Sequence, residues 1–314
     1  MSNQSAVNVK MTDKEFAKRK RQRNFMEDLS AFWFLLPIIA SFVVLLFVPL
    51  MQTLYFSFTD FDGLNLNPNW VGFKNYQKVF SDTSILQGLG FTLAYAILTT
   101  LFVTIIAIPL AVQLNKRFLG RNFARSLFFF LSVPSAAVLG MIWKFIFSPL
   151  KSGLVNSVLG AFGLNPVPWL SNSRLAQFCV IFVAVWAQIG WHATLYLAFL
   201  QSIPSDLYEQ SQVDGANSMQ QFVHITLPQL VPGIVVSTFL LMSGGLKVYD
   251  LPFTLTKGGP GYATNTVSQA IITRGIGMNE YGIASALSVL FAIAMMVVTF
   301  AQLGVSQAIA KRFE

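Results

Sequence analysis

Charged residues are scarce in this chain of 314 residues. Only 11% are Asp, Glu, Lys or Arg, whereas 54% are hydrophobic and 30 are Phe. Because a soluble domain usually carries about 25% charged residues, the composition excludes an ordinary soluble protein and indicates a membrane protein. The net charge of +8 comes from basic residues spread over short links, not gathered on one polar face. That distribution argues against a nucleic-acid partner, which needs clustered phosphate contacts.

Side chains that support metal or covalent chemistry are equally rare. The single cysteine, Cys179, lies in an apolar run, so it forms no intrachain disulfide and we interpret it as a small buried hydrophobe. The two histidines, His192 and His224, have no nearby Cys or carboxylate set that predicts a metal site. The phosphate-cradling G-x-x-x-x-G-K-[ST] loop is absent, as is any identifiable Ser–His–Asp set. We expect no enzyme activity, cofactor or metal in this chain.

Apolar runs dominate what is present. Six of them approach or exceed the roughly 20 residues that cross a bilayer, and each must be helical to satisfy its backbone in lipid. The spans are expected at 31–58, 86–114, 124–147, 175–200, 234–255 and 283–310. The predicted fold is an all-α integral membrane protein with six helices. A polar, basic tail over 1–28, with no apparent cleavable signal, precedes a membrane domain over 29–314.

The basic residues predict the orientation of these spans. Seven lie in the tail, four in the link between the second and third spans, and two at the C-terminus. With six spans these segments share one side, which the positive-inside rule identifies as the cytoplasm. Both termini and the link at about 202–233 are therefore expected in the cytoplasm. The tail itself is expected to be solvated or to contact anionic lipid.

The 202–233 link is patterned as two short helices. Asp206 and Asn217 are expected to cap them, and Gly215 to end the first through a left-handed turn. An ordinary polar loop is the plain alternative. A DNA-reading helix-turn-helix is excluded, because no Lys or Arg occurs between Arg174 and Lys247.

This link resembles the EAA loop found in membrane subunits of ATP-binding-cassette (ABC) importers. Gln210 and Ser211 replace the two alanines of that motif. The resemblance implies that the loop docks in a cleft of an ATPase subunit and transmits its closure. The residues that match the motif are Glu209, Asp214, Gly215, Ala216, Phe222, Ile225, Leu227 and Pro228.

Further segments resemble the carbohydrate permeases of that family, in particular the MalF-like partner. They lie at 55–61, 71–76, 145–156, 169–170 and 255–264, in the expected order. The resemblance implies a permease subunit that moves a saccharide across the bacterial inner membrane by alternating access. It also implies three kinds of partner: a second homologous permease, two ATPase subunits that use ATP and Mg, and an external solute-binding protein.

Polar residues within the spans are costly and therefore informative. In the resembling permeases the sugar is held by the fourth and fifth core spans. The corresponding candidates here are Gln188, Trp191, Gly244, Gly245, Lys247, Tyr249 and Asp250. For Gln188, Trp191 and Tyr249, interhelical packing is an equal alternative. Lys247 and Asp250, three residues apart, are expected to pair on one helical face; a cavity-facing Lys247 would instead favour an anionic saccharide.

A second class of function stays open. An ion-coupled secondary transporter works without ATP but needs an ion or proton site inside the membrane. Asp250 is the one candidate for such a site, and Lys247 would neutralise it.

Overall fold

The computed structural model describes residues 33–65 and 67–310, and the predicted tail over 1–28 lies outside them. The described residues divide into two compact units, one ending at Tyr55 and one beginning at Phe56. Within these residues the secondary structure is helical apart from one isolated bridge, between Thr59 and Trp70. The expected all-α class is confirmed.

In the described residues the first unit is an apolar helix, whose last residue, Phe56, is the first residue of the second unit. It runs from Trp33 to Phe56 and includes a π-helical turn at Val43–Phe47, followed by α2 (Val48–Phe56). None of its most apolar window is buried by the chain itself. Such a helix requires an apolar surrounding, in agreement with the first expected span.

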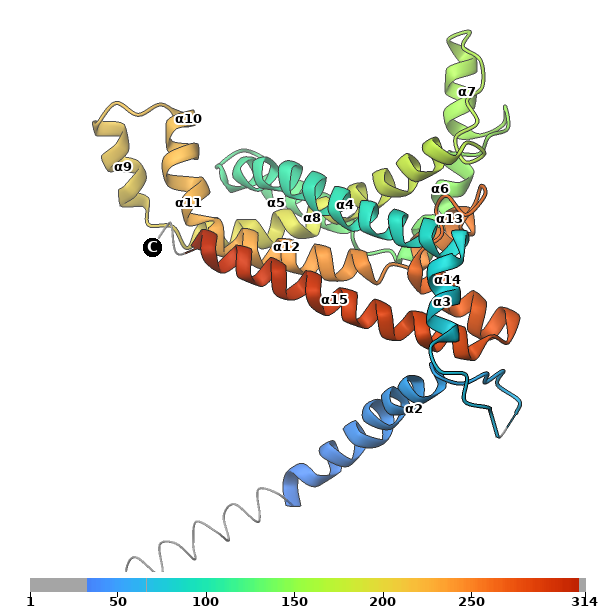
Figure 1. The fold of residues 1–314 in the computed structure, drawn as a ribbon. Helices are drawn as coiled ribbons and strands as arrows, with labels where there is room; N and C mark the ends of the chain where they lie inside the picture. The colour runs from blue at the N-terminus through green and yellow to red at the C-terminus, as the bar shows by residue number, and fades with distance from the viewer. Residues whose placement is uncertain (1–32, 66, 311–314) are drawn as a thin grey trace, which may run out of the picture. The chain divides into compact units, whose positions relative to one another are not determined.

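Four helices of the second unit run alongside one another: α4 (Thr83–Asn115), α8 (Ser173–Gln201), α12 (Val231–Leu246) and α15 (Tyr281–Ala310) (Figure 1). Helix α4 packs against both α8 and α12, and α12 also packs against α15. The packed interior contains Val103 of α4, Tyr196 of α8 and Leu241 of α12, all nearly inaccessible. These long helices place the remaining elements at two opposite ends.

The third expected span is two helices. Helix α5 (Arg121–Phe130) ends before Pro134, and α6 (Ala136–Ile146) begins after Ser135, whose hydroxyl accepts from the amide of Val138. Proline disfavours helical backbone in the residue before it and lacks an amide hydrogen, so the break follows from the sequence at Val133–Ser135. Helix α6 is held close to α13, since a Cβ on Gly140 would lie 1.8 Å from Thr254 Oγ1.

The fifth expected span is also divided. Helix α12 ends at Leu246, directly after the Gly244–Gly245 pair, and α13 (Asp250–Thr256) begins after three intervening residues, with Pro252 in its first turn. Four described helices are long and apolar enough to cross a membrane. A fifth is counted if Ser218–Gln229 and Val231–Leu246, bent by 65°, form one span. Of the six expected spans, the third is therefore broken at Pro134, and the fifth is interrupted between Gly245 and Pro252, as the residues there predict.

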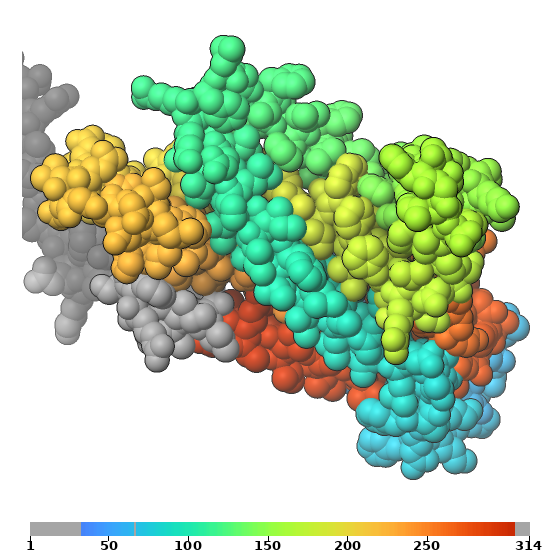
Figure 2. All heavy atoms as spheres, turned by 90° about the horizontal axis from the view of Figure 1, so that it is seen from above, coloured from blue at the N-terminus to red at the C-terminus, as the bar shows by residue number. Residues whose placement is uncertain are grey.

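The ends of the second unit carry different structures (Figures 1 and 2). One end is a hairpin of α9 (Ser205–Val213), α10 (Ser218–Gln221), η2 (Phe222–Thr226) and α11 (Leu227–Gln229), here named the α9–α11 hairpin. The opposite end, here named the far end, contains α3 (Lys74–Ser81), α7 (Leu154–Ala161), α13, α14 (Val267–Ile272) and η3 (Thr273–Gly277).

Candidate functional site

The α9–α11 hairpin turns where the sequence predicts. Gly215 has φ +81°, a left-handed conformation that glycine adopts at little cost. Asn217 caps α10 through its side-chain oxygen, and Gln220 accepts from the amide of Asn217 at 2.8 Å, which completes a capping box. The expectation for Asp206 is wrong. Helix α9 starts two residues earlier than predicted, with Pro204 at the cap and Asp206 in the first turn, where its charge suits the helix dipole.

Three side-chain contacts join the two halves of the hairpin. Tyr208 Oη lies 3.0 Å from Thr226 Oγ1. Gln221 Nε2 donates to Ser211 Oγ at 2.9 Å and to the Tyr208 carbonyl at 3.4 Å, while Ser211 Oγ donates within α9 to the same carbonyl at 2.8 Å. The sequence analysis missed these contacts, because nothing in the spacing shows which polar residues of two short helices will meet.

The eight predicted hairpin residues separate into an exposed tip and a half-buried base. Glu209, Asp214 and Gly215 are exposed, whereas Phe222 packs against the buried cluster of α4 and α8. The tip also exposes two apolar side chains, Val213 at 89% and Met219 at 69%. The other four members, all half-buried, are Ala216, Ile225, Leu227 and Pro228. The tip therefore offers both charged and apolar contacts to another molecule.

The predicted pathway residues of α8 lie in different environments. Trp191 is 40% exposed, while Gln188 is half-buried and donates to the carbonyl of Ala184 at 3.3 Å. His192 is buried, with Nδ1 2.8 Å from Ser237 Oγ of α12. His192 is thus a hydrogen-bonded packing residue, as expected, and Trp191 is the accessible member of this turn.

The expected Lys247–Asp250 pair is wrong. Both residues are exposed, and no ion pair joins them in the part of the chain that the structure describes. The reason is the helix break: Lys247 follows the end of α12 and Asp250 begins α13, so a three-residue spacing no longer brings side chains together. Tyr249 stacks on Phe253 with ring centroids 5.1 Å apart.

The two glycines before this break differ. Gly244 is exposed, with no heavy atom within 4 Å of a Cβ built on it. Gly245 is buried, and a Cβ there would lie 2.8 Å from the Cα of Ala96. Gly245 therefore permits close packing of α12 on α4, and of the two only Gly244 is accessible.

The break between α5 and α6 lies against α8 near the same residues. Ser132 Oγ donates to the carbonyl of Ala187 at 2.8 Å, and Gly190 lets the backbone at Phe128 approach closely. The other break also lies against α8, since Val248 packs in one cluster with Trp186 and Ala187. The sequence analysis missed the first break, although Pro134 followed by Ser135 is a recognisable helix stop and start.

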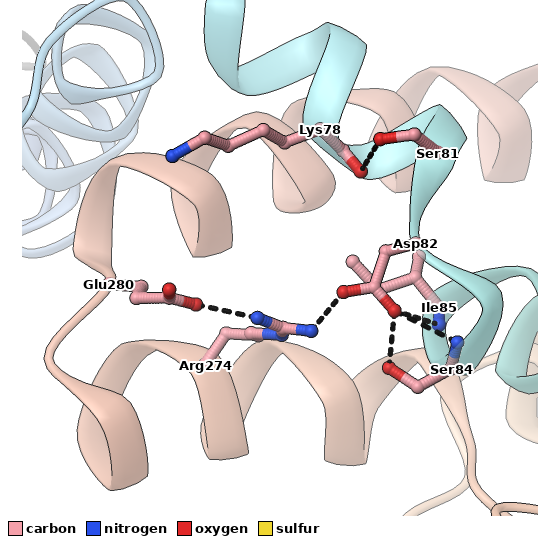
Figure 3. A network of polar contacts seen from close by, with 7 residues as sticks. All are labelled: Lys78, Ser81, Asp82, Ser84, Ile85, Arg274 and Glu280. Carbon is pink, nitrogen blue, oxygen red and sulfur yellow. Dashed lines mark hydrogen bonds and ion pairs between the residues drawn. The ribbon is translucent and has the colours of Figure 1, made fainter.

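The far end is joined by charged side chains. Arg274 of η3 lies between two carboxylates (Figure 3). Its guanidinium is bonded to Asp82, and its Nη1 donates to Glu280 Oε2 at 2.7 Å. Asp82 also accepts from Ser84, from Oγ at 2.6 Å and from N at 2.8 Å, and so caps α4. We name Asp82, Arg274 and Glu280 the far-end ion cluster. The sequence analysis missed it, since 192 residues separate Asp82 from Arg274.

The pKa values follow from these contacts. Burial alone would raise the pKa of Asp82, but hydrogen bonds from Ser84, the charge of Arg274 and the amide of Ile85 outweigh it. The pKa of this carboxyl therefore lies below its ordinary value. Hydrogen bonding to Glu280 raises the pKa of Arg274 despite partial burial. Asp82 and Arg274 thus each favour the ionised form of the other.

A single asparagine organises the 148–170 loop at this end. Asn156 Nδ2 donates to the carbonyls of Ser148, Leu150 and Val167, while its Oδ1 accepts from the Val167 amide and Trp169 Nε1. The Gly-rich segment after α13 is a turn, as expected, with Gly258 at φ +86°. Over residues 33–65 and 67–310, no group of three or more His, Cys, Asp or Glu side chains is placed to hold a metal ion.

Comparison with known proteins identifies the arrangement. Residues 104–314 match the family model of the binding-protein-dependent transport system inner membrane component. A probable ABC transporter permease of Sinorhizobium fredii, y4oQ, is 33% identical and aligns with 89% of this chain and 90% of its own length. A multiple sugar-binding transport system permease of Streptococcus mutans, MsmF, is 32% identical, with 91% of this chain and 98% of its own length aligned.

A solved structure resembles the fold at full length. A chain of a bacterial ABC transporter involved in the import of the acidic polysaccharide alginate superposes with a TM-score of 0.81 and 25% identity. The superposition covers 92% of this chain and 99% of that one. Since the family model covers two thirds of the sequence and the relatives nearly all of it, this chain belongs to the inner-membrane components of binding-protein-dependent transport systems.

Proposed function

We propose that this chain is the transmembrane permease subunit of an ATP-driven importer that carries a saccharide across the bacterial inner membrane. The observation that carries the proposal is near full-length similarity to permeases named for sugar uptake. These include a trehalose/maltose permease of Thermococcus litoralis, 30% identical over 90% of this chain. The family operates with binding proteins, and no finding supports the ion-coupled alternative.

The proposed assembly contains this chain, a second homologous permease, two ATPase subunits and an external solute-binding protein. A neighbouring structure, of an alginate transporter with an alginate pentasaccharide-bound periplasmic protein, supports the binding-protein partner. The α9–α11 hairpin would lie in the cytoplasm and dock on an ATPase subunit, which binds the ATP and Mg. Its exposed Glu209 and Asp214, together with Val213 and Met219, supply the polar and apolar contacts of such a docking surface.

Alternating access would follow from the course of the chain. Closure of the ATPases moves the hairpin, and the hairpin continues through the 65° bend into α12. Helix α12 ends at the Lys247–Tyr249 break, beside the polar turn of α8. Broken membrane helices typically line substrate sites, because their free backbone groups need a cavity or other protein groups.

The pathway residues support a polar substrate with ring faces. Lys247 and Asp250 are exposed and not paired with each other, and a charge facing lipid at this depth would be costly. They would therefore face a water-filled cavity between the two permeases. Trp191 and Tyr249 offer aromatic faces for pyranose rings, and Lys247 would give an anionic saccharide a charge-assisted bond.

Reconstitution tests the function. The complex is purified from its native membrane through a tag on this chain and placed in vesicles with its binding protein. Two labelled probes are used: maltotriose as the neutral sugar and an alginate trisaccharide as the acidic one. We expect ATP-dependent uptake of at least one probe that survives an ionophore. Uptake that continues without ATP but stops when the ion gradient collapses would instead establish the ion-coupled class.

The same vesicles test the role of Lys247. If it binds an acidic saccharide, Lys247→Gln lowers uptake of the alginate trisaccharide by about tenfold or more, since bonds to charged groups contribute about 1.5–3 kcal/mol. Uptake of a neutral probe and assembly with the ATPase should stay near wild type. The matched control is Lys151→Gln, another exposed lysine. Equal loss for both probes would assign Lys247 a structural role.

A further inference from the structure

The backbone of the α9–α11 hairpin reverses direction at one residue, Gly215. Gly215 is exposed, takes a left-handed φ of +81°, and has no heavy atom within 4 Å of a built Cβ. The space around this turn is open, and one backbone hydrogen bond, from the Ala216 amide to the Ser211 carbonyl at 2.9 Å, spans it. The angle must therefore be set by contacts between the two halves.

The helices themselves cannot supply that restraint. Helix α9 has nine residues and α10 has four, whereas isolated helices shorter than about 12–15 residues are marginal in water. Their outer surfaces are also exposed. Beyond the backbone bond at the turn, rigidity within the hairpin must therefore come from side-chain contacts between its halves.

Ser211 and Gln221 provide the central contact. The Ser211 hydroxyl lies between the halves, donating to the Tyr208 carbonyl at 2.8 Å and accepting from Gln221 Nε2 at 2.9 Å. Both residues are half-buried, which limits competition from water. One turn nearer the membrane helices, Tyr208 Oη lies 3.0 Å from the hydroxyl of the buried Thr226. The two contacts tie α9 to both ends of the α10–η2 segment.

We propose that Ser211 and Gln221, supported by Tyr208 and Thr226, form a brace that makes the hairpin move as one body. The proposal rests on the proposed function, in which an ATPase subunit displaces the hairpin. With the brace intact, a displacement of α9 reaches η2, α11 and then α12. Without it, α9 turns about Gly215 and the displacement is lost within the hairpin. Ser211 and Gln221 are positioning residues in this scheme.

The first test measures the hairpin directly. Spin labels are attached to Gln212→Cys and Met219→Cys, two exposed positions, in a Cys179→Ala background of the full chain in lipid nanodiscs. The distance distribution between the labels should be narrow in the otherwise native chain. Ser211→Ala and Gln221→Leu should each broaden it, and Gln221→Leu at least as much, because Gln221 also donates to the Tyr208 carbonyl at 3.4 Å.

Matched controls come from the same elements. Ser205→Ala alters a serine of α9 whose hydroxyl bonds only to the adjacent Asp206, and Gln229→Leu alters the exposed glutamine of α11. Both should leave the distribution narrow. Unchanged distributions in Ser211→Ala and Gln221→Leu would overturn the brace.

The second test measures coupling in the reconstituted complex, as the ratio of probe taken up to ATP hydrolysed. A neutral hydrogen bond between side chains is typically equivalent to a two- to tenfold change in an equilibrium. We expect the ratio to fall by that factor in Ser211→Ala and in Gln221→Leu, while ATP hydrolysis continues. The double variant should lose no more than Gln221→Leu alone, because that change already removes the Ser211–Gln221 contact.

Rescue separates positioning from general stability. Ser211→Thr keeps the hydroxyl and should restore the ratio, whereas a variant that merely unfolds the hairpin would also lose the ATPase on purification. A wild-type ratio in Ser211→Ala would contradict the proposal. If the complex transports neither probe, the function proposed above fails, but the spin-label distances still decide whether the brace exists.

Discussion

At the far end of the bundle, Arg274 joins Asp82 and Glu280 through charged groups that are only partly accessible to water. In the α9–α11 hairpin, the contacts between the halves run between hydroxyl, amide and carbonyl groups that carry no charge. Both ends connect segments that the chain brings together from different elements. The two ends differ in the strength of these contacts and in whether the contacts depend on ionisation.

Hydrogen bonds to charged groups contribute more than bonds between neutral groups, about 1.5–3 against about 0.5–1.5 kcal/mol. The far end is therefore the more rigid of the two, and its strength depends on ionisation. The hairpin is held by weaker contacts that are independent of pH in the neutral range. An element that must move during each transport cycle is better served by the second kind of contact.

The largest expected effect is that of Gly215→Val. A β-branched residue at this left-handed φ costs roughly 1–2 kcal/mol. Relief of this strain would change the direction of the hairpin's turn. We expect more than a tenfold loss of uptake in the reconstituted complex, with the chain still inserted in the membrane. Glu209→Lys, which reverses an exposed charge of the tip, should likewise weaken assembly with the ATPase.

The far end offers a matched control for this change. Gly163 also has a positive φ, +73°, and open space around its Cβ. Gly163→Val should impose similar strain but keep uptake within about twofold of wild type. Comparable losses in both variants would mean that local strain, and not the position in the hairpin, determines the outcome.

A smaller effect is expected from Arg274→Gln. The change leaves Asp82 and Glu280 without their shared cation, and we expect a loss of about 1–2 kcal/mol in the free energy of unfolding, after allowance for partial exposure. Thermal unfolding of the purified chain in detergent measures it. Arg174→Gln, at an exposed arginine of α8, is the control and should change little. Equal stability of the two variants would contradict the role assigned to the ion cluster.

The smallest effect concerns pH. Because the pKa of Asp82 is lower in the folded chain than in the unfolded one, its ionisation stabilises the fold above the unfolded value, near 4, and this contribution is lost as the pH falls through the folded pKa. The difference in melting temperature between wild type and Asp82→Asn should be constant from pH 8 to about 5 and shrink below about 4. The Ser211→Ala effect on the spin-label distances should stay the same between pH 8 and about 5. A wild-type advantage that grows on acidification would refute the assignment.

Several features could be predicted from residue patterns alone. The long apolar runs gave α4, α8 and α15 to within a few residues, because lipid forces such runs to be helical. Asn217 and Gly215 specified the hairpin turn through local backbone preferences. Asp82, not foreseen as a cap, moved the start of α4 to Thr83. Features that depend on one or two neighbouring residues could thus be predicted from the sequence.

Features that depend on residues far apart in the sequence could not be predicted. The predicted Lys247–Asp250 pair assumed a continuous helix, and the break at that point separates the two side chains. Asp82 meets Arg274 only after the whole bundle has formed. Likewise, Gly245 has the character of a flexible break in the sequence but serves close packing on Ala96. Predicting such pairs requires knowing how the elements are placed relative to one another, and a single sequence does not show that.

The contact between α6 and α13 has a consequence for biosynthesis. Helix α6 has 11 residues, about 16 Å of helix, which is half the thickness of the hydrocarbon layer. Its close partner α13, packed at Gly140 and Thr254, is synthesised more than a hundred residues later. The third membrane segment therefore enters the bilayer with its short helix unsupported, and it reaches its final packing only after most of the chain has been translated. Errors introduced near Thr254 would accordingly be seen first as misinsertion around Gly140.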